Sequence, residues 1–229
     1  MEAAPTRGSS EPNVVVSPHS SRAPLPSQAG PDVLSVYKDW GPFLSWIPSA
    51  LGCPKVNSQV AISMIEDAME SAMERDNEEG ATGPWVGLLG FSQGAKLCAS
   101  VLLLQQIQGI YKSRFNFRFG VLLAGRAPLL ALQPGIPTGG ETVVGVNGEE
   151  SVDKGKPIRL RLPTVHVHGM RDSGLHLHRQ LLENCCEVGS TRLLEWDGDH
   201  RVPLKTKDVV ALVKQIVAVA SETGVQFNE

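Results

Sequence analysis

The sequence predicts a three-layer α/β sandwich, in which helices cover both faces of a mostly parallel β-sheet. Short apolar runs typical of buried strands alternate along the chain with amphipathic segments typical of helices. The length of 229 residues and the apolar content of 41% suit one domain with a sizeable core and leave little room for a second domain. The predicted strands are residues 86–89, 117–125, 163–169 and 191–196, and the predicted helices are residues 58–76, 95–108, 174–186 and 206–221.

Charge and cysteine usage narrow the class of protein. A formal net charge of −3 argues against a general nucleic-acid binder or a binder of anionic membranes, because both need a basic surface. The four cysteines, Cys53, Cys98, Cys185 and Cys186, include no C-x-x-C pair, which indicates free thiols in a reducing compartment. Residues 1–7 lack an apolar signal region and no run approaches membrane-spanning length, so we expect a cytoplasmic protein.

The beginning of the chain divides into a polar tail and an aromatic segment. Residues 1–22 are dominated by Pro, Ser, Gly and small polar residues and predict a disordered or divergent segment, with one short apolar run at 14–16. The single domain is expected over residues 23–229. Within it, residues 33–47 are rich in aromatic side chains, which suits the wall of an apolar pocket and equally a loop packed on the core. The candidate substrate-binding residues there are Tyr37, Trp40, Phe43 and Trp46.

Periodicity predicts which side of each helix is buried. In residues 58–76, the side chains expected on the inner face are those of Val60, Met64, Ala68 and Met73. In residues 95–108, the side chains expected to point inward are those of Leu97, Cys98, Val101, Leu102 and Leu104.

The clearest chemical pattern is Gly90-x-Ser92-x-Gly94, between a predicted buried strand and a predicted helix. This is the G-x-S-x-G pattern of a nucleophile elbow, a sharp strand-to-helix turn that strains the serine backbone and exposes its Oγ. We expect both glycines to be needed, because a Cβ would collide with the neighbouring strand or with the incoming helix. A glycine-rich loop between two core elements is the alternative. The strand-turn-helix context favours the elbow and makes Ser92 a candidate nucleophile.

A serine nucleophile needs a base that takes its proton and an acid that orients the base. In α/β-hydrolases these follow the serine along the chain, acid first and histidine second, on loops at the carboxyl ends of parallel strands. Asp172 comes just after the predicted strand 163–169, and His200 comes just after the predicted strand 191–196. The sequence therefore predicts that Ser92, Asp172 and His200 meet at one edge of the sheet, in a reaction that needs no metal and no cofactor.

Other residues compete for the acid and base roles. Asp197 and Asp199 are so close in sequence to His200 that neither would easily reach its far ring nitrogen. His166 and His168 alternate with valines on a predicted strand, as packing residues would.

A metal site is the remaining alternative for the histidines. His176 and His178 stand two residues apart in a predicted helix, where side chains point away from each other, and the sequence offers no Glu-x-x-His or Cys partner to complete a site. We therefore expect no metal.

Two further parts of a hydrolase site can be sought in the sequence. The backbone N–H of Gln93, the residue after the nucleophile, is the expected first oxyanion donor. The second donor normally comes from a His-Gly loop after an early strand, and the only early candidate, the run 14–16, precedes Pro18, which has no N–H. Residues 126–157 are irregular and rich in Gly and Pro, as expected of a lid or a binding loop.

These motifs resemble those of the fungal serine hydrolases of the FSH type, and most closely the stand-alone thioesterases that release chains from highly reducing polyketide synthases. The resemblance spans about residues 23 to 220. The motifs that carry it are Ala29-Gly30-Pro31, Gly41-Pro42-Phe43-Leu44-Ser45-Trp46, Gly90-Phe91-Ser92-Gln93-Gly94-Ala95, the run from Leu162 to Gly169 with Asp172, and His200-x-Val202-Pro203. One part departs from the pattern: family members begin with an apolar strand that ends in His-Gly, which residues 1–22 do not match. We therefore expect an α/β-hydrolase-like sandwich that lacks the family's first strand.

The resemblance implies an acyl-thioester hydrolase that frees a polyketide chain from the acyl carrier domain of a polyketide synthase, with neither nucleic acid nor membrane as a partner. A general carboxylesterase on small acyl esters is the second interpretation, because the three catalytic residues do not choose between oxygen and sulfur leaving groups. A hydrolase-like binding protein, catalytically impaired by the loss of an oxyanion donor, is the third.

Overall fold

The computed structural model describes residues 20–30, 33–34, 38–48, 55–81, 83–109, 111–133, 136, 143–147 and 158–226. The run 14–16, Tyr37, Cys53 and most of the predicted tail 1–22 lie outside these residues. The elements, in chain order, are β1 (Leu25–Ser27), β2 (Phe43–Ser45), α2 (Ser58–Glu78), β3 (Gly87–Phe91), α3 (Gln93–Gln108), β4 (Phe119–Leu123), β5 (Leu129–Ala131), β6 (Val143–Gly145), β7 (Thr164–Gly169), α4 (Leu175–Gln180), the π-helical turn η1 (Leu181–Cys185), β8 (Thr191–Trp196) and α5 (Thr206–Glu222).

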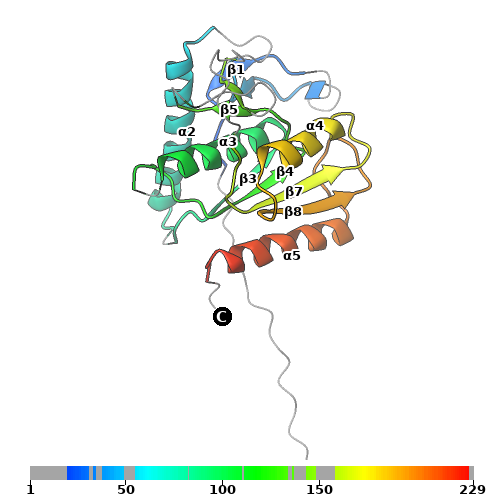
Figure 1. The fold of residues 1–229 in the computed structure, drawn as a ribbon. Helices are drawn as coiled ribbons and strands as arrows, with labels where there is room; N and C mark the ends of the chain where they lie inside the picture. Colours follow the sequence, from blue (N-terminus) through cyan, green and yellow to red (C-terminus); the bar gives the residue numbers. More distant parts are fainter. Residues whose placement is uncertain are drawn as a thin grey trace, which may run out of the picture.

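A four-stranded parallel sheet forms the centre of the domain, in the order β3-β4-β7-β8 (Figure 1). These are the four strands that the sequence predicts. Every residue of β4 and of β7 is buried, as expected of strands between two helical layers. Because the strands are parallel, the residues that follow β3, β7 and β8 all emerge at the same edge of the sheet.

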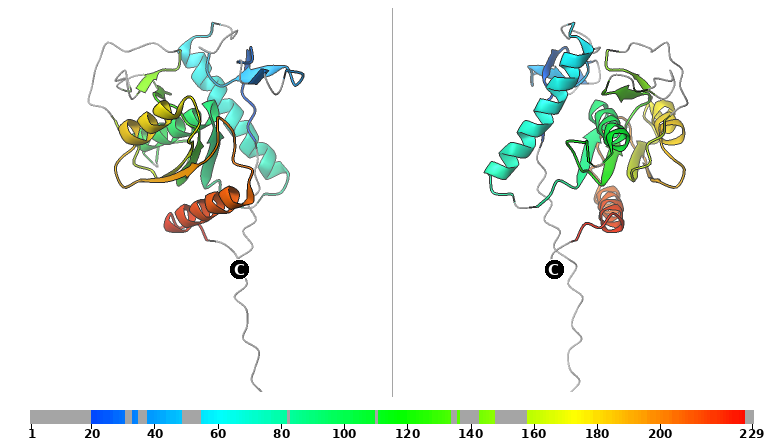
Figure 2. Two further views of the ribbon diagram at one scale, coloured as in Figure 1. Left: turned by 90° about the vertical axis from the view of Figure 1, so that its right-hand side faces the viewer. Right: turned by 60° about the vertical axis from the view of Figure 1, so that its left-hand side comes forward.

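Helices cover both faces of the sheet, which confirms the three-layer α/β prediction. α3 and α4 lie on one face, with α2 beside α3 and packed into the same apolar cluster, and α5 lies on the other face (Figures 1 and 2). Strand β4 shows the alternation that this requires: Leu122 belongs to the apolar cluster beneath α3, whereas Phe119 and Val121 belong to the cluster beneath α5. In the part of the chain that the structure describes, every helix is too short or too polar to cross a bilayer.

The burial of the two long helices on the α3 face was predicted well for α3 and only in part for α2, where Met73 packs against the core as expected. All five side chains predicted to point inward from α3 are buried. In α2 the buried stripe is Ala61, Ile62, Ile65, Met69 and Ala72, whereas Val60, predicted to be buried, is 51% exposed. The observed buried stripe is rotated by about one residue from the predicted stripe. The helix adopts this rotation because it places Ile62, Ile65 and Met69 against the core.

Two small sheets flank the central one. β1 pairs antiparallel with β2, which lies within the aromatic-rich segment 33–47. β5 pairs parallel with β6 inside residues 126–157, so the prediction of an irregular segment was wrong there. β5 is fastened to α3, because the Leu130 N–H donates to Ser100 Oγ at 2.9 Å.

Strand β3, which leads to Ser92, lies at an edge of the central sheet. Within the described residues its sheet partner is β4 alone, and Leu89 in its middle is 63% exposed. The expectation that the family's first strand is missing concerns residues 1–22, most of which lie outside the described residues.

The close approach of α3 to β3 predicts unequal roles for the two elbow glycines. A Cβ at Gly90 would lie 2.4 Å from the carbonyl carbon and oxygen of Gly94. A Cβ at Gly94 would meet no atom of the described residues within 4 Å, so the expectation that both glycines are sterically required was wrong for Gly94.

Gly90→Ala should therefore lower the free energy of unfolding by about 2 kcal/mol or more, because backbone must shift to make room. Gly94→Ala is the matched control. It should be neutral or up to about 1 kcal/mol stabilising, since alanine is the better helix former. Urea denaturation of both variants tests this, and equal losses would contradict the steric argument.

Candidate active site

The turn between β3 and α3 has the backbone of a nucleophile elbow. Ser92 has φ 54° and ψ −113°, a conformation that costs a residue other than glycine about 1–3 kcal/mol. Its N–H donates to Leu123 O at 2.8 Å, which fixes the turn to the end of β4. Gly90 permits the approach of α3 that makes the turn so sharp. The structure thus places the Ser92 side chain at the carboxyl edge of the sheet.

The loops after β7 and β8, which carry the predicted acid and the predicted histidine, are fastened to each other. The Arg171 N–H of the first loop donates to Gly198 O of the second at 2.8 Å. Gly169, at the end of β7, allows this contact, because a Cβ there would lie 2.5 Å from the Asp199 carbonyl oxygen. The two loops therefore hold each other in place, and with them Asp172 and His200.

The three predicted residues meet in one chain of hydrogen bonds. His200 Nε2 lies 2.9 Å from Ser92 Oγ, and His200 Nδ1 lies 2.6 Å from Asp172 Oδ2. The ring of Phe91, the residue before the serine, lies 5.0 Å from the His200 ring, centroid to centroid, and limits its movement. With Nδ1 protonated toward the carboxylate, Nε2 is free to accept the serine proton.

Asp172 is buried and held as an anion. Its side chain is 0% exposed, and its Oδ1 accepts a 2.7 Å hydrogen bond from the Gly174 N–H. Burial raises the pKa of the carboxyl, but the Gly174 N–H and the hydrogen bond with His200 more than offset this, so the pKa lies below its ordinary value. Arg126 adds a positive charge, with Nη2 at 3.6 Å from Oδ1.

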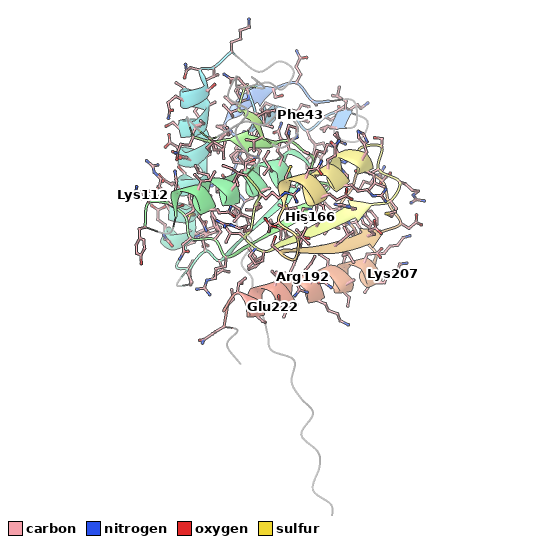
Figure 3. The ribbon with its side chains drawn as sticks, viewed as in Figure 1. Phe43, Lys112, His166, Arg192, Lys207 and Glu222 are labelled. Carbon is pink, nitrogen blue, oxygen red and sulfur yellow. The ribbon has the colours of Figure 1, made fainter. Side chains whose placement is uncertain are left out.

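Three further histidines lie buried behind Asp172. Sequence reasoning gave His166 and His168 a packing role, and both are buried in β7; Figure 3 shows His166 in the sheet layer below α4. Burial lowers the pKa of His166 to about 3, and the pKa values of His168 and His178 to about 4. His178 Nε2 lies 3.5 Å from Asp172 Oδ2. Sequence reasoning missed this contact, because nothing in the local pattern indicates which side of so short a helix faces the loop.

The competing aspartates do not reach the histidine. Asp197 pairs with Arg171 and Asp199 pairs with Arg201, each at 3.4 Å, and both carboxyl groups are more than half exposed. This agrees with the choice of Asp172 over its two rivals.

Gln93, the predicted oxyanion donor, is the first residue of α3, so its N–H has no acceptor within the helix. Its side chain binds the segment after β2: Oε1 accepts from the Trp46 N–H at 2.8 Å and Nε2 donates to Ser45 Oγ at 3.0 Å. The Ile47 N–H donates to Ser45 Oγ as well. Trp46 and Ile47, which lie beside the elbow, therefore have their N–H groups engaged and do not supply the second oxyanion donor in this arrangement.

The predicted substrate-binding residues are brought together only in part. Phe43 and Trp46 are half-buried, and Figure 3 shows Phe43 on the side of α4 that faces away from α5. Trp46 packs against the larger apolar cluster. Trp40 is 77% exposed, and Tyr37 lies outside the described residues.

Among the described residues, one group of side chains could hold a metal ion. The ligand atoms of Asp172, His178 and His200 lie within 4.8 Å of one another, a grouping that the local pattern around His176 and His178 did not indicate. Two histidines and a carboxylate are a ligand set that transition metals use. However, both ring nitrogens of His200 already contact Ser92 and Asp172, so metal binding would replace the hydrogen bond that orients His200.

Comparison with known proteins identifies the family. The family model described as serine hydrolase (FSH1) matches residues 16–212, a range that includes Ser92, Asp172 and His200. Esterase pigG of Monascus ruber is 49% identical over 219 residues, which cover 90% of this chain and 80% of that protein. Esterase claE of Penicillium crustosum is 48% identical over 215 residues, which cover 90% of this chain and 81% of that protein. Esterase citA of Monascus ruber is 48% identical over 210 residues, which cover 89% of this chain and 80% of that protein.

The buried histidines predict a loss of stability in mild acid. The unfolded chain protonates His166, His168 and His178 near pH 6.5, whereas their folded pKa values are about 3 to 4, so the unfolded state binds more protons between these limits. Stability is full above about pH 6.5 and falls as the pH drops toward about 4. The Asp172 contribution is lost only below its ordinary value of 3.8.

From about pH 7 to about pH 5, each histidine should remove about 2 kcal/mol from the free energy of unfolding. Urea denaturation at both pH values measures the loss, and His168→Gln should reduce it by about 2 kcal/mol. A loss of the same size in the variant would contradict this assignment.

Proposed function

The chain belongs to the serine hydrolase family FSH1, and we propose that it hydrolyses acyl esters and thioesters with Ser92 as nucleophile, His200 as general base and Asp172 as the acid that orients His200. The observation that carries the proposal is the unbroken chain of hydrogen bonds from Ser92 Oγ through both ring nitrogens of His200 to Asp172 Oδ2. Such a chain activates a serine hydroxyl, which is a weak nucleophile at its ordinary pKa.

The reaction would proceed in two halves. Ser92 Oγ attacks the acyl carbon while His200 Nε2 takes its proton, and the ionised Asp172 stabilises the imidazolium that forms. As the tetrahedral intermediate collapses, His200 gives this proton to the leaving thiol or alcohol, and the acyl group stays on Ser92. A water molecule then repeats the attack with His200 as its base, and the carboxylic acid leaves as Oγ regains its proton.

The oxyanion that forms in each half needs hydrogen-bond donors. We propose the Gln93 N–H as one of them, supported by its place at the first position of α3, next to Ser92. The dipole of this helix adds positive potential at the same end.

We propose Phe43 and Trp46 as part of the acyl-binding wall, with Trp40 at its exposed rim and Tyr37 beside them in sequence. The support is the hydrogen bond between the Trp46 N–H and Gln93 Oε1, which fastens this aromatic segment to the residue after the nucleophile. Half-buried aromatic side chains next to a nucleophile suit an apolar acyl chain.

We propose further that the acyl group arrives as a thioester on the carrier domain of a polyketide synthase, and that the protein works in the cytoplasm. The first part rests on the motifs shared with polyketide-releasing thioesterases. The second is supported by Cys98 and Cys186, buried thiols of a kind that a reducing compartment preserves. A carboxylesterase acting on small esters is the second candidate, favoured by the relatives, which are named esterases.

A fluorophosphonate probe should label the wild-type protein at Ser92. Ser92→Ala should lose the label and reduce kcat by about 10⁴-fold or more, because no other group replaces Oγ. Ser63→Ala, which changes an exposed serine of α2, is the matched control and should leave both unchanged. Equal labelling of a folded Ser92→Ala variant would end the proposal, and a folded wild type that neither labels nor turns over would indicate a binding protein.

A pair of substrates with the same long acyl chain separates the two candidate reactions. If a thioester is the natural substrate, kcat/KM for the thioester should exceed that for the oxyester by at least about tenfold, which is about 1.4 kcal/mol of transition-state stabilisation. Each kcat/KM should first be divided by the rate constant for uncatalysed hydrolysis of the same substrate, because thiols leave more readily than alcohols. A corrected ratio near one, or one that favours the oxyester, would support the carboxylesterase.

A further inference from the structure

We propose that His178 is a positioning residue that holds Asp172 Oδ2 in the orientation His200 requires, acting as a neutral hydrogen-bond donor. This inference rests on the proposed function for its kinetic consequence. Its geometry comes from four groups that converge on one buried carboxylate.

The carboxylate of Asp172 is contacted on both of its oxygens. Oδ1 accepts from the Gly174 N–H at 2.7 Å and lies 3.6 Å from Arg126 Nη2. Oδ2 lies 2.6 Å from His200 Nδ1 and 3.5 Å from His178 Nε2. A carboxylate oxygen accepts more than one hydrogen bond, so His178 and His200 can share Oδ2.

His178 has no other described partner for the nitrogen that faces Asp172. Its side chain is 0% exposed, and both ring nitrogens are buried with no hydrogen-bond partner among the described residues. A buried imidazole without a partner is costly, and Nε2 needs to move by only a few tenths of an ångström to donate to Oδ2. We therefore assign Asp172 Oδ2, 3.5 Å away, as the acceptor of the His178 Nε2–H.

The charge state of His178 suits this role. Burial lowers its pKa to about 4, although the nearby Asp172 opposes the shift, so the ring is neutral when the enzyme works near neutral pH. The His178 and His200 rings lie 6.2 Å apart, centroid to centroid. A cationic His178 would repel the imidazolium that His200 becomes during the reaction, whereas a neutral donor fixes Asp172 without that penalty.

The surrounding fold keeps His178 in place. The His178 N–H donates to Gly174 O at 3.2 Å, so the same turn that binds Asp172 Oδ1 also begins the helix that carries His178. The His168 ring lies 5.5 Å from the His178 ring on the side of β7. The turn at Gly174 thus positions both the Gly174 N–H and the His178 side chain next to Asp172.

Three substitutions separate hydrogen bonding from packing. In His178→Gln the side-chain nitrogen can occupy the position of Nε2 and donate to Asp172. In His178→Asn the amide corresponds to Nδ1 and falls short of Oδ2, and in His178→Leu no donor remains. His176→Leu, at an exposed position of the same helix, is the matched control.

We expect His178→Gln and His176→Leu to keep the wild-type kcat within about threefold. His178→Asn and His178→Leu should lower kcat about 10- to 100-fold with KM unchanged, the effect of losing a hydrogen bond to a charged group. The low-field proton resonance of the His200 Nδ1–H bonded to Asp172 provides a readout besides activity. It should move in the Asn and Leu variants and stay in place in the Gln variant.

Folded Asn or Leu variants with wild-type kcat and an unmoved resonance would overturn the proposal, and so would a Gln variant as impaired as the Leu variant. If the Leu variant does not fold, the comparison of Asn with Gln decides. If neither the wild type nor any variant hydrolyses an ester, the proposed function fails, and the low-field resonance still decides whether His178 positions Asp172.

Discussion

The hydrogen bond between His200 Nδ1 and Asp172 Oδ2, at 2.6 Å, is the contact on which the rest of the site depends. It requires the ends of β7 and β8 to be adjacent, and the parallel pairing of these strands provides that. It also requires their loops to approach closely, which Gly169 allows. Once His200 is oriented, its Nε2 points at Ser92, whose strained turn presents Oγ from the end of β3. The fold thus converts three residues far apart in sequence into one hydrogen-bonded chain.

Much of this arrangement follows from the sequence because it depends on patterns with a fixed physical meaning. The four strands of the central sheet, the elbow around Ser92, and the loops of Asp172 and His200 all follow from local periodicity and from the rule that parallel strands end at one edge. The prediction was wrong where competing apolar stripes were nearly equal, as in α2, and where a strand pair formed inside a Gly- and Pro-rich segment. It was also wrong for Gly94, because its surroundings depend on which elements lie beside β3.

The contact between Asp172 and His178 could not be predicted from the sequence. The contact of His178 with Oδ2 depends on how a six-residue helix sits over a turn, which no periodic pattern encodes. The buried histidines around the site also lower the stability of the fold in mild acid. Each stays neutral at pH values where the unfolded chain would be protonated. The same burial that supplies a neutral donor to Asp172 therefore makes the fold sensitive to acid.

Direct observation of the acyl-enzyme would test most sharply whether the hydrogen-bonded chain performs catalysis. The protein would be mixed with an acyl thioester, quenched with acid within the first turnover, digested and analysed by mass spectrometry. The peptide that carries Ser92 should gain the mass of the acyl group, and this mass should disappear as the free acid accumulates. Turnover with no acyl group on Ser92, or with the acyl group on another residue, would contradict the assignment of Ser92 as the nucleophile.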